Sequence, residues 1–303
     1  MQQKINLREE RDFGQKINAV FTFLQQNFKP LFKSLLFIVG PVALVAIACM
    51  SFFVTQIFSN INGAGPMRTD NFTSLGFVGY VVGFLLLMLA FLLVHLVVYT
   101  YMKEYLTDKY KPIETGQIIR VIAKKIVYII LSMIGLSIVL FLAMFFLSMI
   151  PFIGPFIFFC GFIYISVPLS LGVIIMLMEE ATPVHVFNRM LYLTSGKWWS
   201  TFGILAVIGI IQGVTNYMFF LPVYFVTLAN ALHVGIVDSL SSGLVVVYSA
   251  VAIIGVSMLF SLPAVAIGFQ YFNLVERKEG IGLLEEIEQI GESQPMTDNE
   301  EDF

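Results

Sequence analysis

Few residues of this chain combine the type and the spacing that chemistry requires, and the first of them is His95. It is the titratable side chain embedded most deeply in a long apolar run, and the next charged residue, Lys103, follows about 12 Å further along a helix. A histidine at such a depth can relay protons. No carboxylate lies in the same run, so a hydrogen bond to a neighbouring helix is the favoured interpretation and a proton relay the alternative.

A second group with chemical potential consists of Glu179, Glu180, His185 and Arg189. His185 and Arg189 are four positions apart and therefore share one face of a helix. The group has the charges to bind a headgroup phosphate, although a solvated polar face is the favoured alternative. The two glutamates either pair with a basic segment or end an apolar run and face water. The basic residues concerned are Arg120, Lys124 and Lys125.

Uncharged polar residues interrupt the last two apolar runs at Gln212, Asn216 and Gln270. Together with His95 they are candidates to line a polar cavity. The more usual role of such residues is to form hydrogen bonds between helices. Both interpretations remain open at this stage.

The motifs of common enzymes and pumps are absent from the sequence. There is no GxxxxGK[ST] for nucleotide binding, no HExxH for zinc and no GxSxG for a nucleophilic serine. The cysteines, Cys49 and Cys160, lie in separate apolar runs and form no CxxC motif. We therefore predict no catalytic residue, no metal site, no cofactor and no nucleic-acid partner.

Six apolar runs must position these residues. None contains Asp, Glu, Lys or Arg, and each reaches the about 20 residues that a helix needs to cross a bilayer. The chain is 58% hydrophobic and only 12% charged, which excludes an ordinary soluble protein. We predict an all-α, polytopic membrane protein with six transmembrane helices. The runs are 35–58, 75–101, 126–149, 152–178, 201–221 and 244–272.

The distribution of positive charge indicates the orientation. Every lysine and arginine except Arg68 lies before the first run, between the second and third, between the fourth and fifth, or after the sixth. Because translocation of Lys and Arg is unfavourable, these segments are expected in the cytoplasm. We predict a multi-pass protein of a bacterial cytoplasmic (inner) membrane, with both termini cytoplasmic and with anionic lipid at its cytoplasmic face.

Amphipathic cytoplasmic helices are expected before the first, third and fifth runs. In the first of them, Asp12 and Gln15 can close the N-terminal turn, and Pro30 is expected to end the helix. Its apolar stripe suits either the headgroup region or docking onto other cytoplasmic segments. The stripe consists of Phe13, Ile17, Val20, Phe21 and Leu24.

The other two amphipathic segments precede the third and fifth runs. Thr115 can cap the earlier one. Thr182 is a suitable N-cap for the later one, with Pro183 at its first helical position. Trp198 and Trp199 follow, where interfacial aromatic anchors are expected.

Two prolines and one turn are expected to shape the spans. Pro168 and Pro263 lie inside apolar runs and can kink them. Pro151 disfavours a helical conformation at Ile150, so the third and fourth runs should turn there. The apolar segment 222–243 is expected to link the last two runs along the outer interface.

The chain divides into an N-terminal cytoplasmic segment (1–34), a six-span membrane domain (35–273) and an acidic cytoplasmic tail (274–303). The tail is expected to be disordered from about residue 293 and to be available to a protein partner. A repeat of three units, each an amphipathic helix followed by a helical hairpin, is a further interpretation, although any hairpin-built membrane protein shows such a rhythm. The units are 1–105, 106–178 and 179–273.

Two stretches carry a recognisable pattern. Residues 19–36 read AVFTFLQQNFKPLFKSLL, and residues 178–199 read MEEATPVHVFNRMLYLTSGKWW. They resemble corresponding stretches of a bacterial six-span family, the membrane domain found ahead of some glycerophosphoryl diester phosphodiesterases and in stand-alone membrane proteins. The resemblance implies this architecture and a membrane location. Hydrolase activity is not expected, because about 30 residues follow the sixth run and a catalytic barrel of that kind needs about 250.

Three classes of function are compatible with these features. The favoured one is a non-catalytic integral membrane protein with a role in scaffolding, assembly or envelope homeostasis. The alternative is a transporter or flippase for a lipid or another apolar solute. An intramembrane lipid enzyme is disfavoured, since no pair of carboxylates or histidines lies at a common depth. A water-accessible cavity around His95, Gln212 and Asn216 would favour the transporter, and a solid core would favour the first class.

Overall fold

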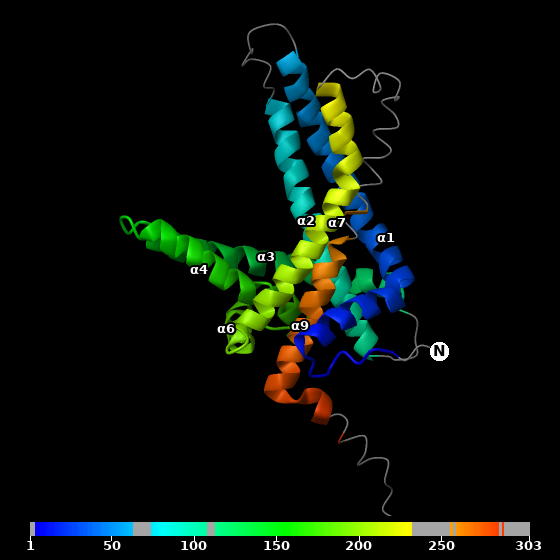
Figure 1. The fold of residues 1–303 in the computed structure, drawn as a ribbon, viewed down its shortest axis with the longest axis vertical. Coiled ribbons are helices and arrows are strands. Elements are labelled where there is room, and N and C mark those ends of the chain that lie inside the picture. Colours follow the sequence, from blue (N-terminus) through cyan, green and yellow to red (C-terminus); the bar gives the residue numbers. More distant parts are fainter. Residues whose placement is uncertain are drawn as a thin grey trace, which may run out of the picture.

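The structure, a computed structural model, describes residues 4–62, 74–107, 113–231, 255–256, 259–284 and 287. This part of the chain is all-helical and contains no strand. Parts of α1, α2, α6 and α7 pack around α9, and we call this region the base. From the base, α1, α2 and α7 extend together in one direction (Figure 1). They are α1 (Phe13–Asn62), α2 (Ser74–Thr107), α3 (Thr115–Ser148), α4 (Gly154–Leu169), α5 (Gly172–Glu179), α6 (Pro183–Thr194), α7 (Trp198–Ala231) and α9 (Ser261–Glu279).

Within these residues, five helical stretches are long and apolar enough to cross a membrane. This finding is compatible with a multi-pass membrane protein. Residues 255–256 and 259–272 of the predicted sixth run, 244–272, are described, and most of them belong to α9. The five stretches are Phe13–Met50, Phe77–Thr107, Thr115–Ser148, Gly154–Glu179 and Trp198–Pro222.

Helix α1 corrects the expectation that Pro30 ends an N-terminal helix. The first turn closes as predicted, because Asp12 N donates to Gln15 Oε1 at 2.9 Å and Gln15 N donates to Asp12 Oδ1 at 2.8 Å. The helix then continues through Pro30 to Asn62. It changes direction on the way, as the blue ribbon of Figure 1 shows, and such a bend relieves the clash between a proline ring and the preceding turn. The predicted interfacial segment and the first span are therefore one bent helix.

The start of helix α3 also differs from the prediction that Thr115 caps a separate amphipathic helix. Thr115 is the first residue of the helix, the N-cap position belongs to Glu114, and no side-chain capping bond forms there. The Thr115 hydroxyl instead lies 3.0 Å from Ser34 Oγ, which ties α3 to α1. The predicted amphipathic segment and the third span are again continuous. The turn predicted at Ile150 is present, and α4 begins after it at Gly154.

Three other prolines, Pro168, Pro263 and Pro222, have different effects on the helices that contain them. At Pro168 the predicted kink is a full interruption of the helix, since α4 ends at Leu169 and α5 begins at Gly172. Pro263 lies in the first turn of α9, where a proline removes no helical hydrogen bond. Helix α7 runs through Pro222 to Ala231, so the predicted linker 222–243 begins as helix, and its residues 232–243 lie outside the described part.

Helix α9 stands at the centre of the base. Nearly all of its residues from Ser261 to Val275 are buried, on every face of the helix. A helix buried all round must be enclosed by other elements, and α1, α2, α6 and α7 all contact it. The fit is close, because a Cβ on Gly268 would lie 2.5 Å from Met102 Sδ of α2. The acidic tail beyond 287 lies outside the described residues.

Candidate functional site

Helix α6 presents the charged group that the sequence singles out. It begins at Pro183 after an extended Thr182, and the chain leaves it through Gly196 at φ 75°. Val186, Met190 and Leu193 are fully buried and recur at helical spacing. Their packing fixes the rotation of the helix and turns Arg189 towards the ends of α5 and α9.

Arg189 joins three helices. Its guanidinium forms a bidentate ion pair with Glu279, with Nη2 2.9 Å from Oε2, and its Nε lies 3.0 Å from Glu179 Oε1. The Tyr271 hydroxyl donates to the same Glu179 Oε1 at 2.9 Å. We call these four residues the Arg189 network. Bidentate pairs of this kind fix geometry as well as contributing energy.

The charges of the Arg189 network shift each other's titration. Hydrogen bonds from Arg189 lower the pKa of Glu279, and those to Glu279 are the largest cause that raises the pKa of Arg189. Both carboxylates are about three-quarters buried, with side-chain exposures of 21% for Glu179 and 28% for Glu279. Each of the three guanidinium nitrogens donates to a protein carboxylate, so the Arg189 network joins helices rather than forming an open anion site.

The predicted group of four stays together only in part, because Glu179, His185 and Arg189 are neighbours and Glu180 is not. His185 is exposed, and its Nε2 lies 3.9 Å from Glu179. Glu180 points elsewhere and pairs with Lys125 at 2.6 Å and with Lys103 at 3.4 Å. Hydrogen bonds from both lysines lower its pKa, with Lys125 the larger cause. Glu180 therefore connects the end of α5 to α3 and α2, as one of the two sequence alternatives proposed.

Glu180 adopts a strained conformation to reach these lysines. It is the C-cap of α5, in the left-handed region at φ 52° and ψ 33°. That conformation costs a residue with a Cβ about 1–2 kcal/mol. The other two basic candidates of the sequence, Arg120 and Lys124, are exposed and make no ion pair among the described residues.

The polar residues inside the helices are not gathered in one cavity. Gln270 accepts from Lys16 Nζ at 2.9 Å and donates to Thr201 Oγ1 at 2.8 Å, near the start of α7. Gln212 lies 11 residues beyond Thr201 on α7, about 16 Å along the helix. His95 is buried and bonds through Nδ1 to the Phe91 carbonyl of its own helix at 2.9 Å.

Asn216 is the exception among these side chains, since its buried Oδ1 finds no hydrogen-bond partner within the described residues. It lies one turn beyond Gln212, which is itself buried. Neither residue is joined to His95 by a hydrogen bond in this part of the chain. The four candidates thus occupy three separate places.

Trp198 has a specific structural task. Pro168 has no N–H group, so the carbonyl of Tyr164, four residues earlier, loses its helical partner. The Trp198 indole Nε1 donates to that carbonyl at 2.9 Å and its ring stacks on Tyr164 at 5.6 Å. Trp198 therefore compensates for the proline and joins α7 to α4. Trp199, by contrast, is 77% exposed.

Replacing Trp198 with Phe should destabilise the chain by about 1 kcal/mol, because the Tyr164 carbonyl loses a neutral hydrogen bond while the stacking partner remains aromatic. The measurement is the thermal unfolding midpoint in detergent. Trp199→Phe is the matched control and should leave the midpoint unchanged. Equal losses in the two variants would show that the indole hydrogen bond does not contribute.

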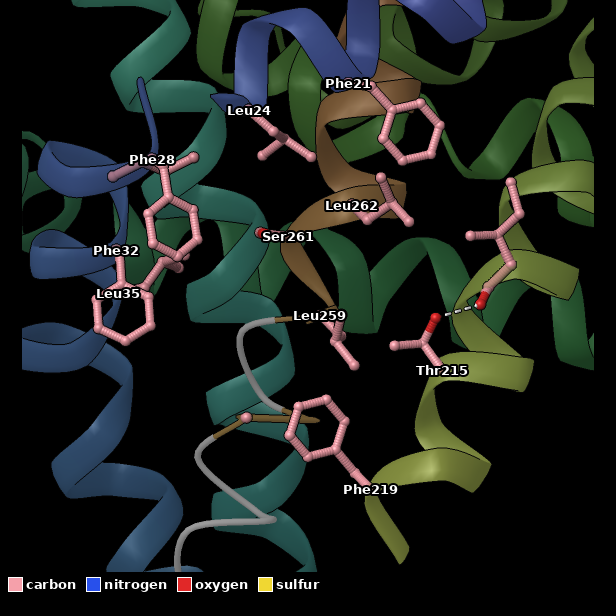
Figure 2. A pocket seen from close by; sticks show the side chains of 13 residues that line it. Phe21, Leu24, Phe28, Phe32, Leu35, Thr215, Phe219, Leu259, Ser261 and Leu262 are labelled. Atoms are coloured by element: carbon pink, nitrogen blue, oxygen red, sulfur yellow. Dashed lines mark hydrogen bonds between the residues drawn. The ribbon is translucent and has the colours of Figure 1, made fainter. Parts of the chain in front are cut away.

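Two of the apolar cavities in the described part of the chain are lined by α1 and α7 together. One, of about 390 Å³, sits between α1, α7 and the start of α9, and Figure 2 shows its aromatic and aliphatic lining. Thr215 lies on its wall, but its hydroxyl bonds to the Ile211 carbonyl at 2.8 Å. The other, of about 480 Å³, is lined by α1, α2 and α7 together with Val256 and Phe260. No group of His, Cys, Asp and Glu residues in the described part is suited to a metal ion.

The sequence interpretation missed two important residues. Glu279 falls within the predicted acidic tail, 274–303, although it ends α9 and pairs with Arg189. Lys16 is not among the candidate residues of the sequence, although it is 4% exposed. A signal existed for Lys16, because it lies three residues after Phe13 and four before Val20, within the apolar stripe.

No family model, curated protein or solved structure matches this chain.

Proposed function

We propose that this chain is a non-catalytic integral membrane protein with a structural role, as a scaffold or in the assembly or maintenance of the cell envelope. The observation that supports this most is the solid base around α9, in which polar side chains form hydrogen bonds with side chains of neighbouring helices. Arg189 pairs with both Glu179 and Glu279. Such a base holds elements together and offers no reacting group to a substrate.

The proposed placement is a bacterial inner membrane, with six spans and both termini in the cytoplasm. The base then lies on the cytoplasmic side, where the first parts of α1 and α3 and all of α6 contact the headgroup region. The positive-inside distribution of Lys and Arg supports this orientation. Membership of the six-span family that the chain resembles, with its phosphodiesterase-associated members, is part of the same proposal.

The orientation predicts opposite labelling of two cysteines introduced at Asn62 and Ser293, in a chain whose Cys49 and Cys160 are replaced by alanine. A membrane-impermeant maleimide applied to intact cells should modify the cysteine at 62 and spare that at 293, because only the former lies outside. Permeabilised cells provide the control, since both sites should then react. Labelling of 293 alone in intact cells would reverse the orientation.

The second candidate is a transporter or flippase for a lipid or another apolar solute, and the two apolar cavities favour it. They lie beside the long helices and are large enough to hold part of an acyl chain. Their linings carry few polar groups, so they suit an apolar solute better than an ion.

Reconstitution separates the two candidates. The full chain is placed in vesicles that contain a fluorescent phospholipid, and a membrane-impermeant quencher reports movement of that lipid between leaflets. A structural protein should leave the rate about that of protein-free vesicles. A rate that rises in proportion to the amount of protein would refute the structural proposal and assign the chain to the flippase class.

A further inference from the structure

An apolar groove lies between α1 and α7, beside the start of α9. It is the cavity of about 390 Å³ drawn in Figure 2. The polar side chains of its lining are Ser261 and Thr215, and the Thr215 hydroxyl is already bonded to the Ile211 carbonyl. An engineered apolar cavity of about 150 Å³ is enough to bind benzene, so this groove has ample room for a hydrocarbon ligand.

The lining of the groove is long rather than compact. On α1 it extends from Phe21 to Leu35, about 21 Å of helix, and on α7 from Ile211 to Phe219, about 12 Å. Aliphatic and aromatic side chains of both helices face the space (Figure 2). A long apolar lining suits an extended hydrocarbon chain and disfavours a charged group inside the groove.

Phe28 lies at the open side of the groove. Its side chain belongs to the lining and is nevertheless 59% exposed, and its ring stacks on that of Phe32 with the centroids 5.4 Å apart. Each of the two rings is followed in the sequence by an exposed lysine, Lys29 or Lys33. Because successive residues are about 100° apart around a helix, the two lysines form a row beside the row of rings.

Lys29 and Lys33 have no counter-ion in the part of the chain that the structure describes. Neither belongs to an ion pair there, and α1 contains no Asp or Glu. Glu114 precedes Thr115, whose hydroxyl lies 3.0 Å from Ser34 Oγ, but it pairs with neither lysine. Like charges four residues apart on a helix repel each other, and an anion beside both removes this penalty. The open side of the groove is therefore suited to an anion.

We propose that the groove binds an anionic phospholipid, with one acyl chain between α1 and α7 and the phosphate against Lys29 and Lys33. Pro30 lies between the two lysines, close to where the predicted amphipathic segment meets the first span, and this is headgroup depth in the proposed orientation. A lipid in this position fills the space between two long helices. The inference goes beyond the structural role proposed above and rests on its placement of the chain in a membrane.

Photo-cross-linking of the full chain in mixed micelles of neutral detergent and lipid tests the position of the acyl chain. The probe is a phosphatidylglycerol with a diazirine on one acyl chain, and its adducts are mapped by mass spectrometry. Adducts on Ile211 and Thr215, which line the groove, should exceed those on Val214 and Met218, which are exposed on the same helix. Micelles have no sides, so the result does not depend on the orientation of the chain.

Thr215→Phe fills the groove from α7. Val214→Phe is the matched control, because Val214 is 55% exposed and does not line the groove. Adducts on the lining should decrease about tenfold in Thr215→Phe, the size of a moderate overpacking penalty, and stay constant in Val214→Phe. If Thr215→Phe does not fold, the adduct positions in the parent chain decide. Adducts mainly on the exposed residues, or an equal decrease in the two variants, would overturn the proposal.

A phosphatidylcholine probe with the same acyl chain tests the charge of the headgroup. Phosphatidylglycerol should label the lining about fivefold more strongly, the size of one or two exposed charge contacts. Lys29→Gln combined with Lys33→Gln should remove this difference. Arg120→Gln combined with Lys124→Gln is the matched control and should preserve it, because both residues are exposed bases on α3.

Equal labelling of the lining by the two lipids in the parent chain would overturn the assignment of an anionic headgroup. A lining that neither lipid labels would show that the groove is closed to lipid and would overturn the proposal as a whole. Both outcomes are separate from the cysteine labelling described above, which tests the membrane placement.

Discussion

Replacing Arg189 with Met should destabilise the chain by about 2–3 kcal/mol, because it leaves Glu179 and Glu279 largely buried and without their cation. Methionine keeps much of the length and apolar volume of the arginine stem, so the loss reports mainly on charge. The penalty is at the lower end for a broken buried pair, since water still reaches part of both carboxylates. The measurement is the unfolding midpoint of the full chain in detergent.

Arg120→Met is the matched control for this change. Arg120 is an exposed arginine on α3 that makes no ion pair among the described residues, and its replacement should alter the midpoint little. Glu279→Gln combined with Arg189→Met should recover part of the loss, because one of the two unpaired carboxylates is then neutral. Equal effects of the Arg189 and Arg120 variants would show that the Arg189 network does not stabilise the fold.

The stability contributed by the Arg189–Glu279 ion pair should also depend on pH. The pKa of Glu279 is lowered in the folded chain, so its contribution to stability is fully present above the unfolded value of about 4.3 and is lost as pH falls through the lower folded value. The thermal unfolding midpoint of the parent chain should therefore decrease as the pH is lowered through this range. Arg189→Met should show a shallower decline, because its Glu279 no longer has the partner that lowers the pKa.

Local features of the fold follow directly from the sequence. The reciprocal bonds of Asp12 and Gln15 involve residues three positions apart, and the break after Pro168 follows from a missing N–H group. Pro30 obeys the same chemistry but gives a different outcome, because the helix can bend there and continue to Asn62. A local rule identifies where a helix is perturbed. The packing around the proline decides whether the helix stops.

The candidate site could be predicted only in part, for a related reason. Charge and spacing identify Arg189 and Glu180 as residues with unusual roles. Their partners depend on which helices meet at the base, and Glu279 lies 90 residues from Arg189. Gln270 and Lys16 are separated by 254 residues, and only the central position of α9 brings them together. Contacts of this kind are fixed by tertiary packing, which periodicity along one helix does not report.

Gly83 occupies a sterically demanding position where α1 and α2 pack against each other. A Cβ built there would lie 2.8 Å from the backbone oxygen of Ala46 and 2.6 Å from Met50 Cγ. Ala46 is fully buried, so α1 and α2 approach through small residues, as helices in membranes commonly do. The backbone oxygen cannot rotate away, so an added methyl group forces the two helices apart.

Gly83→Ala should therefore destabilise the chain by about 1–3 kcal/mol, the usual cost of overpacking. The effect opposes intrinsic propensity, because alanine favours a helix over glycine by about 1 kcal/mol. Gly209→Ala on α7 is the matched control, since no atom lies within 4 Å of its Cβ position. That variant should be neutral or more stable than the parent in the thermal midpoint. A Gly83→Ala variant more stable than the parent would show that α1 and α2 are not in close contact at this level. Small residues would then not explain how these two long helices pack.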